Sequence, residues 1–583
     1  MARYQRLFRG GMIIDGSRAP RYRGDIGIRD GRIQTIGRID PADADEVIDA
    51  TGLIVAPGFV DLHSHYDGQV SWDADFLPSS AHGVTTVVMG NCGVGFAPLR
   101  PGQADRLVKL MEGVEEIPGT VLYEGLDWKW ETFGDYLDRL DQQPHTINVA
   151  TQIPHDPVRL YVMGDRAATQ QPATEDDVEQ MKNIVREALK AGAFGFSTGR
   201  SDTHRTSDGR DTPAAVAEER ELTGIASVLR DLPYRILSAV NDFDTFKGPA
   251  AFEAEFDLME KMARAAGRPM TLTTLERLGD PDQWLRVAGR VEKARAAGLD
   301  MRMQVAPRGV GILNGLRTTP NLFIAKPTYR AIRHLPHDQL VAELRKPEVR
   351  EKILTEPFIK VSEIDRSAPP QIDQAVAGLE FVSARFYELG DPPNYEPKPE
   401  DSIYARAKAR GVSVLEEIYD VMLKHNGEGL IYFPIFNYMQ GSLETTAKMI
   451  RHPAAHMGLG DGGAHVGTIS DAAWTTFFLQ HWTTRAEGAI TLERAIQLLT
   501  SVSADFMGLK DRGRIAVGQA ADINVIDRAN LRLHRPYIAY DLPAGGKRLL
   551  QKATGYVMTT VAGTPIVEND TPTTAVPGRL LRA

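Results

Sequence analysis

The sequence predicts an α/β protein: a TIM-like (β/α)8 barrel with a small β-sandwich domain built from both chain ends. From residue 58, short apolar runs alternate with helical patterns, which is typical of βα units around a parallel sheet. Before residue 58 and again after about residue 500, short strands and tight turns replace that alternation. A chain of 583 residues is long enough for one large domain and a smaller one.

Residues 1–57 form the N-terminal part of the predicted sandwich. Their apolar runs are short, and the dipeptides Asp15-Gly16 and Asp30-Gly31 between them are hairpin signals. The runs read "YQRLFRGGMIIDG", "GDIGIRDGRIQTIGRI" and "DEVIDATGLIVAPG".

Residues 58–490 form the predicted barrel. One helix is expected after residue 174, because Thr174 and Asp177 resemble a capping box and apolar residues then repeat on one face. A doubly wound open sheet is the alternative, but no Gly-x-Gly-x-x-Gly turn follows a strand. The expected strands cover 59–63, 84–90, 147–153, 194–198, 235–240, 270–275, 301–306 and 456–461, with 430–436 as a ninth candidate.

Two further segments complete the predicted organisation. Residues 307–430 are rich in proline and charge and are too long for an ordinary βα connection, so we interpret them as an insertion over the barrel mouth. Residues 491–583 return to strands and turns, as in "DRGRIAVGQAADINVID", and supply the C-terminal part of the sandwich.

The composition narrows the class of function. A formal net charge of -10 argues against nonspecific nucleic-acid binding, which requires basic surface. We find neither a secretory signal nor an apolar stretch that could span a bilayer, so no membrane partner is expected. A single cysteine, Cys92, excludes an intramolecular disulfide and suits a reducing cytoplasm. A small-molecule substrate is expected, and a homo-oligomer is left open.

Metal-ligating residue types follow several of the expected strands. His63 and His65 end the first strand, Cys92 follows the second, and Asp461 ends the last. Alternate residues of a strand point the same way, so the two histidines can reach one ion. Imidazole, thiolate and carboxylate together suit zinc better than magnesium or calcium. Each residue alone is more often structural, but the combination at strand ends predicts a metal site.

Other polar residues near strand ends are candidates for binding the substrate. His155 and Arg159 follow the third strand, Arg200 and His204 follow the fourth, and His465 lies four residues beyond Asp461. The guanidinium group of arginine can donate two hydrogen bonds to one carboxylate, so Arg200 is a candidate to bind a free carboxylate of the substrate. The alternative is an ordinary loop residue, bonded to the backbone or solvated.

Several stretches resemble the amidohydrolase superfamily, and within it the D-aminoacylase (N-acyl-D-amino-acid deacylase) family. They are "VAPGFVDLHSHYD", "HGVTTVVMGNCGVGFAP", "GLGDGGAH" and "DRGRIAVGQAADINVID", and the resemblance covers nearly the whole chain. It implies a metal-bearing (β/α)8 barrel with a β-sandwich. It also implies hydrolysis of a C–N amide bond other than a peptide bond, most often in an N-acyl-amino acid.

The resemblance also implies roles for particular residues. His63 and His65 match the first-strand metal pair, Cys92 matches a zinc-ligating cysteine, and Asp461 matches an aspartate that accepts the proton of the attacking water. His155 and Arg159 in "QIPHDPVRL" resemble the family's Gly-His-x-x-Leu-Arg segment.

The chain departs from the family at the ends of strands five and six. The family has histidines there, whereas this chain reads "RILSAVNDF" and "MTLTTLERLG". Three interpretations are open: one metal held by His63, His65, Cys92 and Asp461; recruitment of His155, His204 or His465; or loss of catalysis. The cofactor is therefore expected to be one or two zinc ions, with another divalent metal left open.

The function predicted from the sequence is metal-dependent hydrolysis of an N-acyl-amino acid. One alternative is a hydrolase of a cyclic amide, lactone, carbamate or xenobiotic amide. The other is a non-catalytic barrel that has lost part of the metal site.

Overall fold

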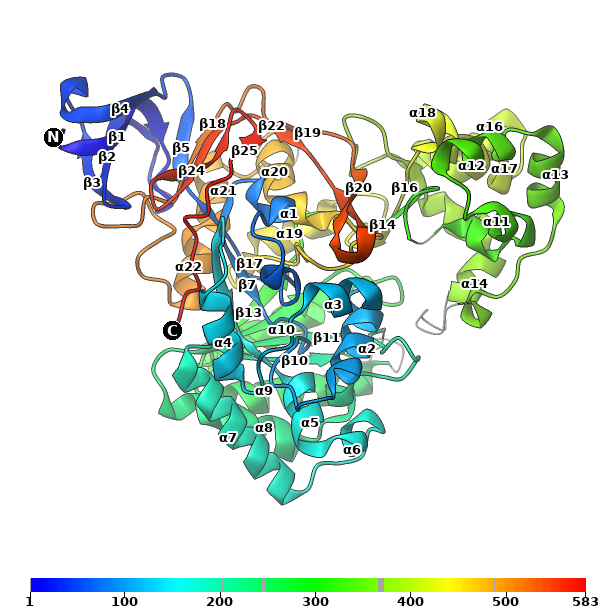
Figure 1. Ribbon diagram of the computed structural model, residues 1–583, viewed down its shortest axis with the longest axis horizontal. Helices are drawn as coiled ribbons and strands as arrows, with labels where there is room; N and C mark the ends of the chain where they lie inside the picture. Colours follow the sequence, from blue (N-terminus) through cyan, green and yellow to red (C-terminus); the bar gives the residue numbers. More distant parts are fainter. Residues whose placement is uncertain (1, 202, 244–247, 320, 365–371, 487) are drawn as a thin grey trace.

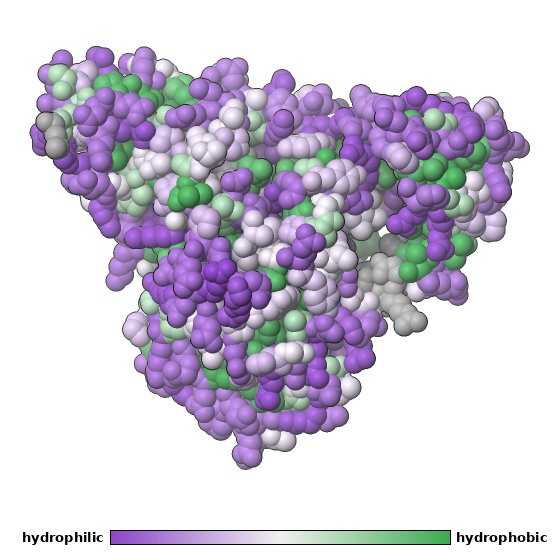
Figure 2. Space-filling model, in the orientation of Figure 1, coloured by the Kyte–Doolittle hydropathy of each residue, from purple (hydrophilic) through white to green (hydrophobic). Residues whose placement is uncertain are grey.

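The computed structural model describes residues 2–201, 203–243, 248–319, 321–364, 372–486 and 488–583. Figure 1 shows a central body of strands and helices, a β-rich region that contains the N-terminus, and a helical lobe on the opposite side. The visible face is mostly hydrophilic (Figure 2), as the composition predicts.

Parallel strands form the centre of the body. They lie in two sheets, β6-β7-β8 and β17-β13-β12-β11-β10-β9. One residue separates β8 from β9, and a parallel bridge joins Ser64, beyond β6, to Gly462, beyond β17. Their bounds are β6 (Phe59–Asp61), β7 (Val84–Met89), β8 (Asn148–Thr151), β9 (Ile153–Pro154), β10 (Gly195–Arg200), β11 (Ile236–Asn241), β12 (Met270–Thr274), β13 (Met301–Val305) and β17 (Ala455–Met457).

Helices connect these strands and cover them, so the strands are buried on both faces, as is usual for parallel sheets. The predicted capping box is confirmed: Thr174 accepts from the backbone N–H of Asp177, and Asp177 accepts from the N–H of Thr174. The main connecting helices are α2 (Ala104–Val114), α4 (Phe133–Asp141), α5 (His155–Met163), α7 (Glu175–Ala191), α8 (Glu219–Ser227), α9 (Pro249–Ala266), α10 (Gln283–Ala296) and α19 (Glu444–Arg451).

The two ends of the chain meet in one mixed sheet. β5 (Ile54–Pro57) pairs antiparallel with β18 (Ile523–Ile526), so strands from near the two ends of the chain lie side by side. The Asp30-Gly31 hairpin is confirmed, with both residues at positive φ. The other strands of this sheet are β1 (Tyr4–Ile13), β2 (Tyr22–Arg29), β3 (Arg32–Gly37), β4 (Ala44–Asp49), β23 (Tyr556–Val561), β24 (Thr564–Glu568) and β25 (Thr571–Pro572).

The structure corrects the C-terminal boundary of the parallel-strand region. Helices α21 (Leu492–Leu499) and α22 (Ser501–Met507) pack against β6 and β17, because their apolar faces cover those strands. Residues 491–507 therefore lie with the parallel strands, and the C-terminal strands begin at β18. The hairpin β20 (Tyr537–Leu542)–β21 (Gly546–Leu550) extends from the mixed sheet toward the parallel strands.

The insertion is a mainly helical lobe with a hydrophobic core of its own. Its stalk is an antiparallel sheet of β14 (Val310–Asn314), β16 (Ile431–Phe436) and β15 (Tyr387–Glu388). The predicted ninth strand is thus β16, which pairs antiparallel in the stalk and does not join the parallel sheets. The lobe's main helices are α11 (Pro327–Ile332), α12 (His337–Leu344), α13 (Pro347–Thr355), α16 (Ile403–Arg410) and α17 (Val414–Met422).

We expect the lobe to loosen without unfolding the body when its core is opened. Ile418 is fully buried in the core of the lobe, so Ile418→Ala should destabilise the lobe by about 2–5 kcal/mol. Hydrogen exchange should then rise in residues 321–364 and 372–430, while β10–β13 keep their protection. Equal loss of protection in both regions would contradict an independent core.

Candidate metal centre

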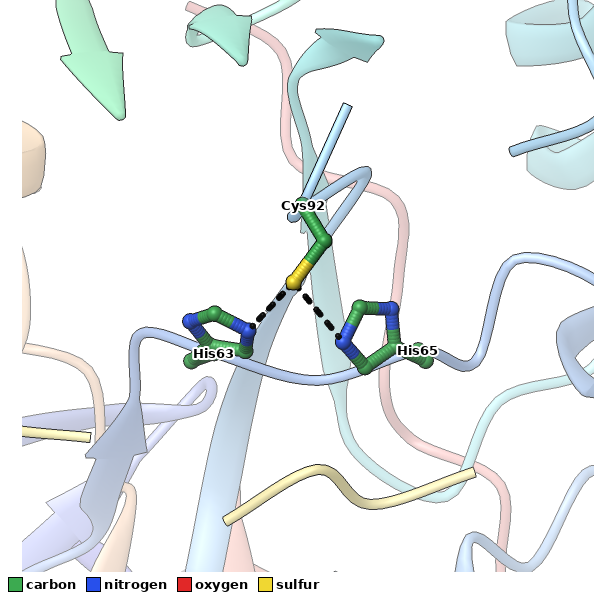
Figure 3. A group of neighbouring side chains, drawn as sticks. All are labelled: His63, His65 and Cys92. Atoms are coloured by element: carbon green, nitrogen blue, oxygen red, sulfur yellow. Dashed lines mark hydrogen bonds between the residues drawn. The ribbon is translucent and has the colours of Figure 1, made fainter. Parts of the chain in front are cut away.

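Three metal-ligating side chains converge at the ends of β6 and β7 (Figure 3). His63 Nε2 lies 3.3 Å from Cys92 Sγ, and His65 Nε2 lies 3.7 Å from the same sulfur. Their donor atoms all lie within 4.8 Å of one another, and all three residues are buried. Such spacing fits one ion held by two nitrogens and one sulfur.

Asp461 faces the same point from the segment that follows β17. Its Oδ1 lies 3.4 Å from His63 Nε2 and 3.7 Å from His65 Nε2. The backbone holds it there, because the N–H of Asp461 donates to the carbonyl of His63 and the N–H of His65 donates to that of Gly462. The structure thus brings together all four residues predicted as metal ligands.

Gln304 is hydrogen-bonded to Nδ1 of His63, and the carboxyl group of Glu115 lies close to Nδ1 of His65. His63 Nδ1 lies 2.7 Å from Gln304 Oε1 on β13, and His65 Nδ1 lies 3.3 Å from Glu115 Oε1. An amide oxygen or a carboxylate at Nδ1 favours the tautomer with the proton on that nitrogen. The Nε2 lone pairs of both rings are then directed at the point that Cys92 and Asp461 share.

A strained turn presents Cys92. Its backbone has a φ of 56°, and a Cβ added at Gly199 on β10 would lie 2.2 Å from the carbonyl oxygen of Cys92. Asn91 ties the turn to the histidine segment by donating to the carbonyl of Ser64, and it accepts from Gln152 Nε2. The glycine-rich sequence around Cys92 is therefore required by positive φ and close backbone approach.

The site places several acidic groups close together in a largely buried space. Burial, then Glu115 and Asp461, raise the pKa of the Cys92 thiol well above its usual range. Burial raises the pKa of Glu115 to about 8, an effect that Asp461 and Asp67 increase and His465 opposes. Burial and the neighbouring His63 lower the pKa of His65, so that its imidazole is neutral. Two imidazole rings, a thiol and carboxyl groups gathered without a compensating cation are a donor set that fits a divalent metal.

The charge of His204 is felt at this cluster. Burial lowers the pKa of His204 to about 4, an effect that Asp242 opposes, and His204 in turn lowers the pKa of His65. A neutral imidazole in this place can bind a substrate group or extend the metal shell, as the sequence suggested.

His465 is brought to the acidic side of the centre. Its Nδ1 lies 3.4 Å from Glu116 Oε2, and its Nε2 lies 3.8 Å from Glu115 Oε2. Burial lowers the pKa of His465, but hydrogen bonding and attraction from these carboxylates and from Asp461 outweigh it and raise the pKa to about 10. The protonated imidazolium ring of His465 has no free lone pair with which to bind a metal. A role in binding the substrate is therefore favoured over a role as a metal ligand.

A cavity opens beside the centre. Asp461 and His465 line it, together with Arg548 and Leu549 of the C-terminal hairpin. The hairpin is fixed there by the N–H of Leu549, which donates to the carbonyl of Val466. The C-terminal strands therefore supply one wall of the space next to the metal ligands.

The structure corrects the assignment of His155 and Arg159 to substrate binding. Both are fully buried, and both bind Glu221 Oε1, at 2.9 Å from His155 Nε2 and 2.8 Å from Arg159 Nε. Thr198 occupies the other nitrogen of His155, and backbone carbonyls of Pro213 and Gln171 accept from the remaining guanidinium groups. The cluster joins α5 to α8 and to β10.

Arg200 is corrected in the same way. Its Nε and Nη2 both donate to the carboxylate of Glu255, at 2.8 and 2.7 Å, and its Nη1 donates to the carbonyl of Ala217. The Arg200 guanidinium group, which was expected to bind a substrate carboxylate, already binds the carboxylate of Glu255 on α9.

Sequence reasoning missed Gln304 and Glu115. A weak signal was present for each: Gln304 is a polar residue inside an apolar strand pattern, and Glu115 begins an acidic pair after α2. Neither signal identified the histidine that each residue would orient.

The sequence profile of the amidohydrolase family matches residues 46–377 and 405–567. This chain belongs to the amidohydrolase family. Among known proteins, D-aminoacylase of Alcaligenes xylosoxydans xylosoxydans is 39% identical over 193 residues, which are 33% of this chain and 37% of that enzyme. The match therefore spans little more than a third of this curated relative.

Two solved structures extend the likeness of this amidohydrolase to its whole length. A D-aminoacylase, described as having a binuclear metal centre with one-metal activation and second-metal attenuation, shares its fold with a TM-score of 0.64 at 23% identity and complete coverage of both chains. N-acyl-D-glutamate deacylase of Bordetella bronchiseptica, complexed with zinc and a phosphonate inhibitor, has a TM-score of 0.63 at 24% sequence identity. This alignment also covers both chains completely. The predicted resemblance to D-aminoacylases is confirmed. Within the described residues, no helix has both the length and the apolar character to cross a membrane.

We expect Gln304→Leu to weaken metal binding, because His63 would lose the acceptor that fixes its tautomer. The loss should be about 10- to 100-fold in metal affinity, measured by competition with a chromophoric chelator. Gln304→Glu keeps an acceptor oxygen at the same place and serves as the matched control. Equal affinity in the Leu variant and the parent would show that Gln304 does not position the ring.

Proposed function

We propose that this amidohydrolase is a metal-dependent hydrolase that cleaves the C–N amide bond of an N-acyl-amino acid. The observation that carries the proposal is the convergence of His63, His65 and Cys92 on one point that the Asp461 carboxylate also faces. The deacylase names of the relatives support the substrate class.

The proposal includes a closed (β/α)8 barrel as its scaffold. The order of the two parallel sheets, the direct succession of β8 and β9, and the Ser64–Gly462 bridge are consistent with a single ring of strands. In such a barrel the carboxyl ends of the strands face the active site, which is where the candidate ligands lie.

His63, His65 and Cys92 would hold the metal, and zinc suits their nitrogen and sulfur donors best. When bound, the ion would supply Lewis-acid polarisation of the scissile carbonyl and make an adjacent water more acidic. A related deacylase structure contains zinc, which supports this choice.

The chain's own residues would supply proton transfer and orientation. The Asp461 carboxylate accepts the proton of the attacking water at Oδ1 or Oδ2 and returns it to the departing amine nitrogen. Gln304 and Glu115 hold the two imidazoles in the tautomer that faces the ion. Because Arg200 is already paired with Glu255, the substrate is expected to meet His204, His465 and the cavity wall formed by the C-terminal hairpin.

Asp461→Asn tests the proton-transfer role. Asparagine keeps the size of the side chain but cannot accept a proton, so the turnover rate should fall roughly 100- to 10,000-fold. Metal content, measured by elemental analysis, should stay near the parent value because the other three donors remain. A variant as fast as the parent would remove Asp461 from the mechanism.

A substrate comparison tests the reaction class. Purified protein, supplied with zinc during expression, should release free amino acids from N-acetyl-D-amino acids, as measured by amine detection. Treatment with a chelator should abolish the release, and added zinc should restore it. Turnover of cyclic imides but not of N-acyl-amino acids would favour the alternative reaction class.

A further inference from the structure

A buried ion pair lies at the ends of β11 and β12, where the resembled family has histidines and this chain has none. Arg277 Nη1 lies 2.5 Å from Asp242 Oδ1, and both side chains are less than a tenth exposed. The guanidinium also lies over the ring of Phe436, with its central carbon 5.3 Å from the ring centroid. Such a pair is costly to bury and is held by specific partners.

The oxygens of Asp242 are both engaged. Ser201 Oγ donates to Oδ2 at 2.6 Å, while Oδ1 faces Arg277. Arg277 Nη2 contacts the carbonyl of Asn241 at 3.5 Å. The carboxylate at the end of β11 is therefore already bound by the protein.

This ion pair is adjacent to the metal centre. The Cys92 turn lies directly against β10 at Gly199, and β10 is the neighbour of β11, with Arg200 opposite Asn241.

We propose that the Asp242–Arg277 ion pair takes the place of a second metal ion, so that the centre binds one ion per chain. The inference rests on the proposed metal-dependent function and specifies its stoichiometry. A guanidinium stays charged at all relevant pH values, and its positive charge repels a second cation at short range. It also occupies the Asp242 carboxylate at the end of β11, and β12 (Met270–Thr274) carries no imidazole in its place.

The D-aminoacylase structure with the same fold is described as having a binuclear metal centre. The proposed difference, one metal ion instead of two, would therefore come from the residues of this chain and not from the fold. The charge balance is kept without the second ion, because the cation that neutralises Asp242 is part of the polypeptide. One fixed cation thus replaces one exchangeable cation.

Metal counting tests the inference separately from the proposed function. Protein dialysed against excess zinc and then freed of unbound ion should contain 1 ion per chain by mass spectrometry. Two tightly bound ions would overturn the mononuclear centre while leaving the hydrolase intact. No bound ion would overturn the proposed function itself. Loading with manganese adds a spectroscopic readout, because a single ion gives an uncoupled electron paramagnetic resonance signal.

Arg277→His tests whether the guanidinium excludes the second ion. This variant removes the fixed charge, releases Asp242 and adds an imidazole at the end of β12, so metal content should rise toward 2 ions per chain. Arg302→His is the matched control, because Arg302 pairs with Asp300 near the opposite end of the neighbouring strand β13. The metal content of the Arg302→His variant should stay at 1 ion per chain.

A folded Arg277→His protein, verified by circular dichroism, that still binds only 1 ion would overturn the role of Arg277. If the variant does not fold, the zinc count and the manganese spectrum of the parent protein still decide between one ion and two.

Discussion

The structure around the centre depends on one electrostatic constraint: several acidic groups share a buried space with the imidazoles of His63 and His65. Burial and mutual repulsion raise the pKa values of Cys92 and Glu115, while burial lowers that of His65. Cys92 and Glu115 cannot become negative cheaply without a cation among them, whereas the imidazole of His65 is already in the neutral state that binds a metal. A cation at the point that His63, Cys92 and Asp461 share would relieve this cost.

The backbone conformation, as well as the side chains, brings these acidic groups and imidazoles together. Cys92, Asp461 and His465 all have positive φ, at 56°, 48° and 47°, which is uncommon for residues other than glycine. Each lies in a turn beyond a strand end, where hydrogen bonds to neighbouring segments hold the conformation. The unusual backbone angles occur at residues whose side chains must point toward the candidate metal centre, while the strands that precede these turns remain regular.

Much of this arrangement could be predicted from the sequence, because strand periodicity fixes where each strand ends. That reasoning placed His63, His65, Cys92 and Asp461 together. It failed for His155, Arg159 and Arg200, because a position after a strand does not reveal whether a carboxylate from another helix, such as Glu221 or Glu255, already binds the side chain. The contacts of Gln304 with His63 and of Arg277 with Asp242 join distant segments, and no local pattern encodes them.

The antiparallel pairing of β5 with β18 has a consequence for biosynthesis. The chain emerges from the ribosome N-terminus first, so β5 is made long before β18, its partner on the far side of more than four hundred residues. Until β18 is made, the edge of β5 that it will cover is unpaired and able to pair wrongly. The hairpin that forms one wall of the cavity beside Asp461 is made even later, so this side of the candidate site is completed only near the end of synthesis.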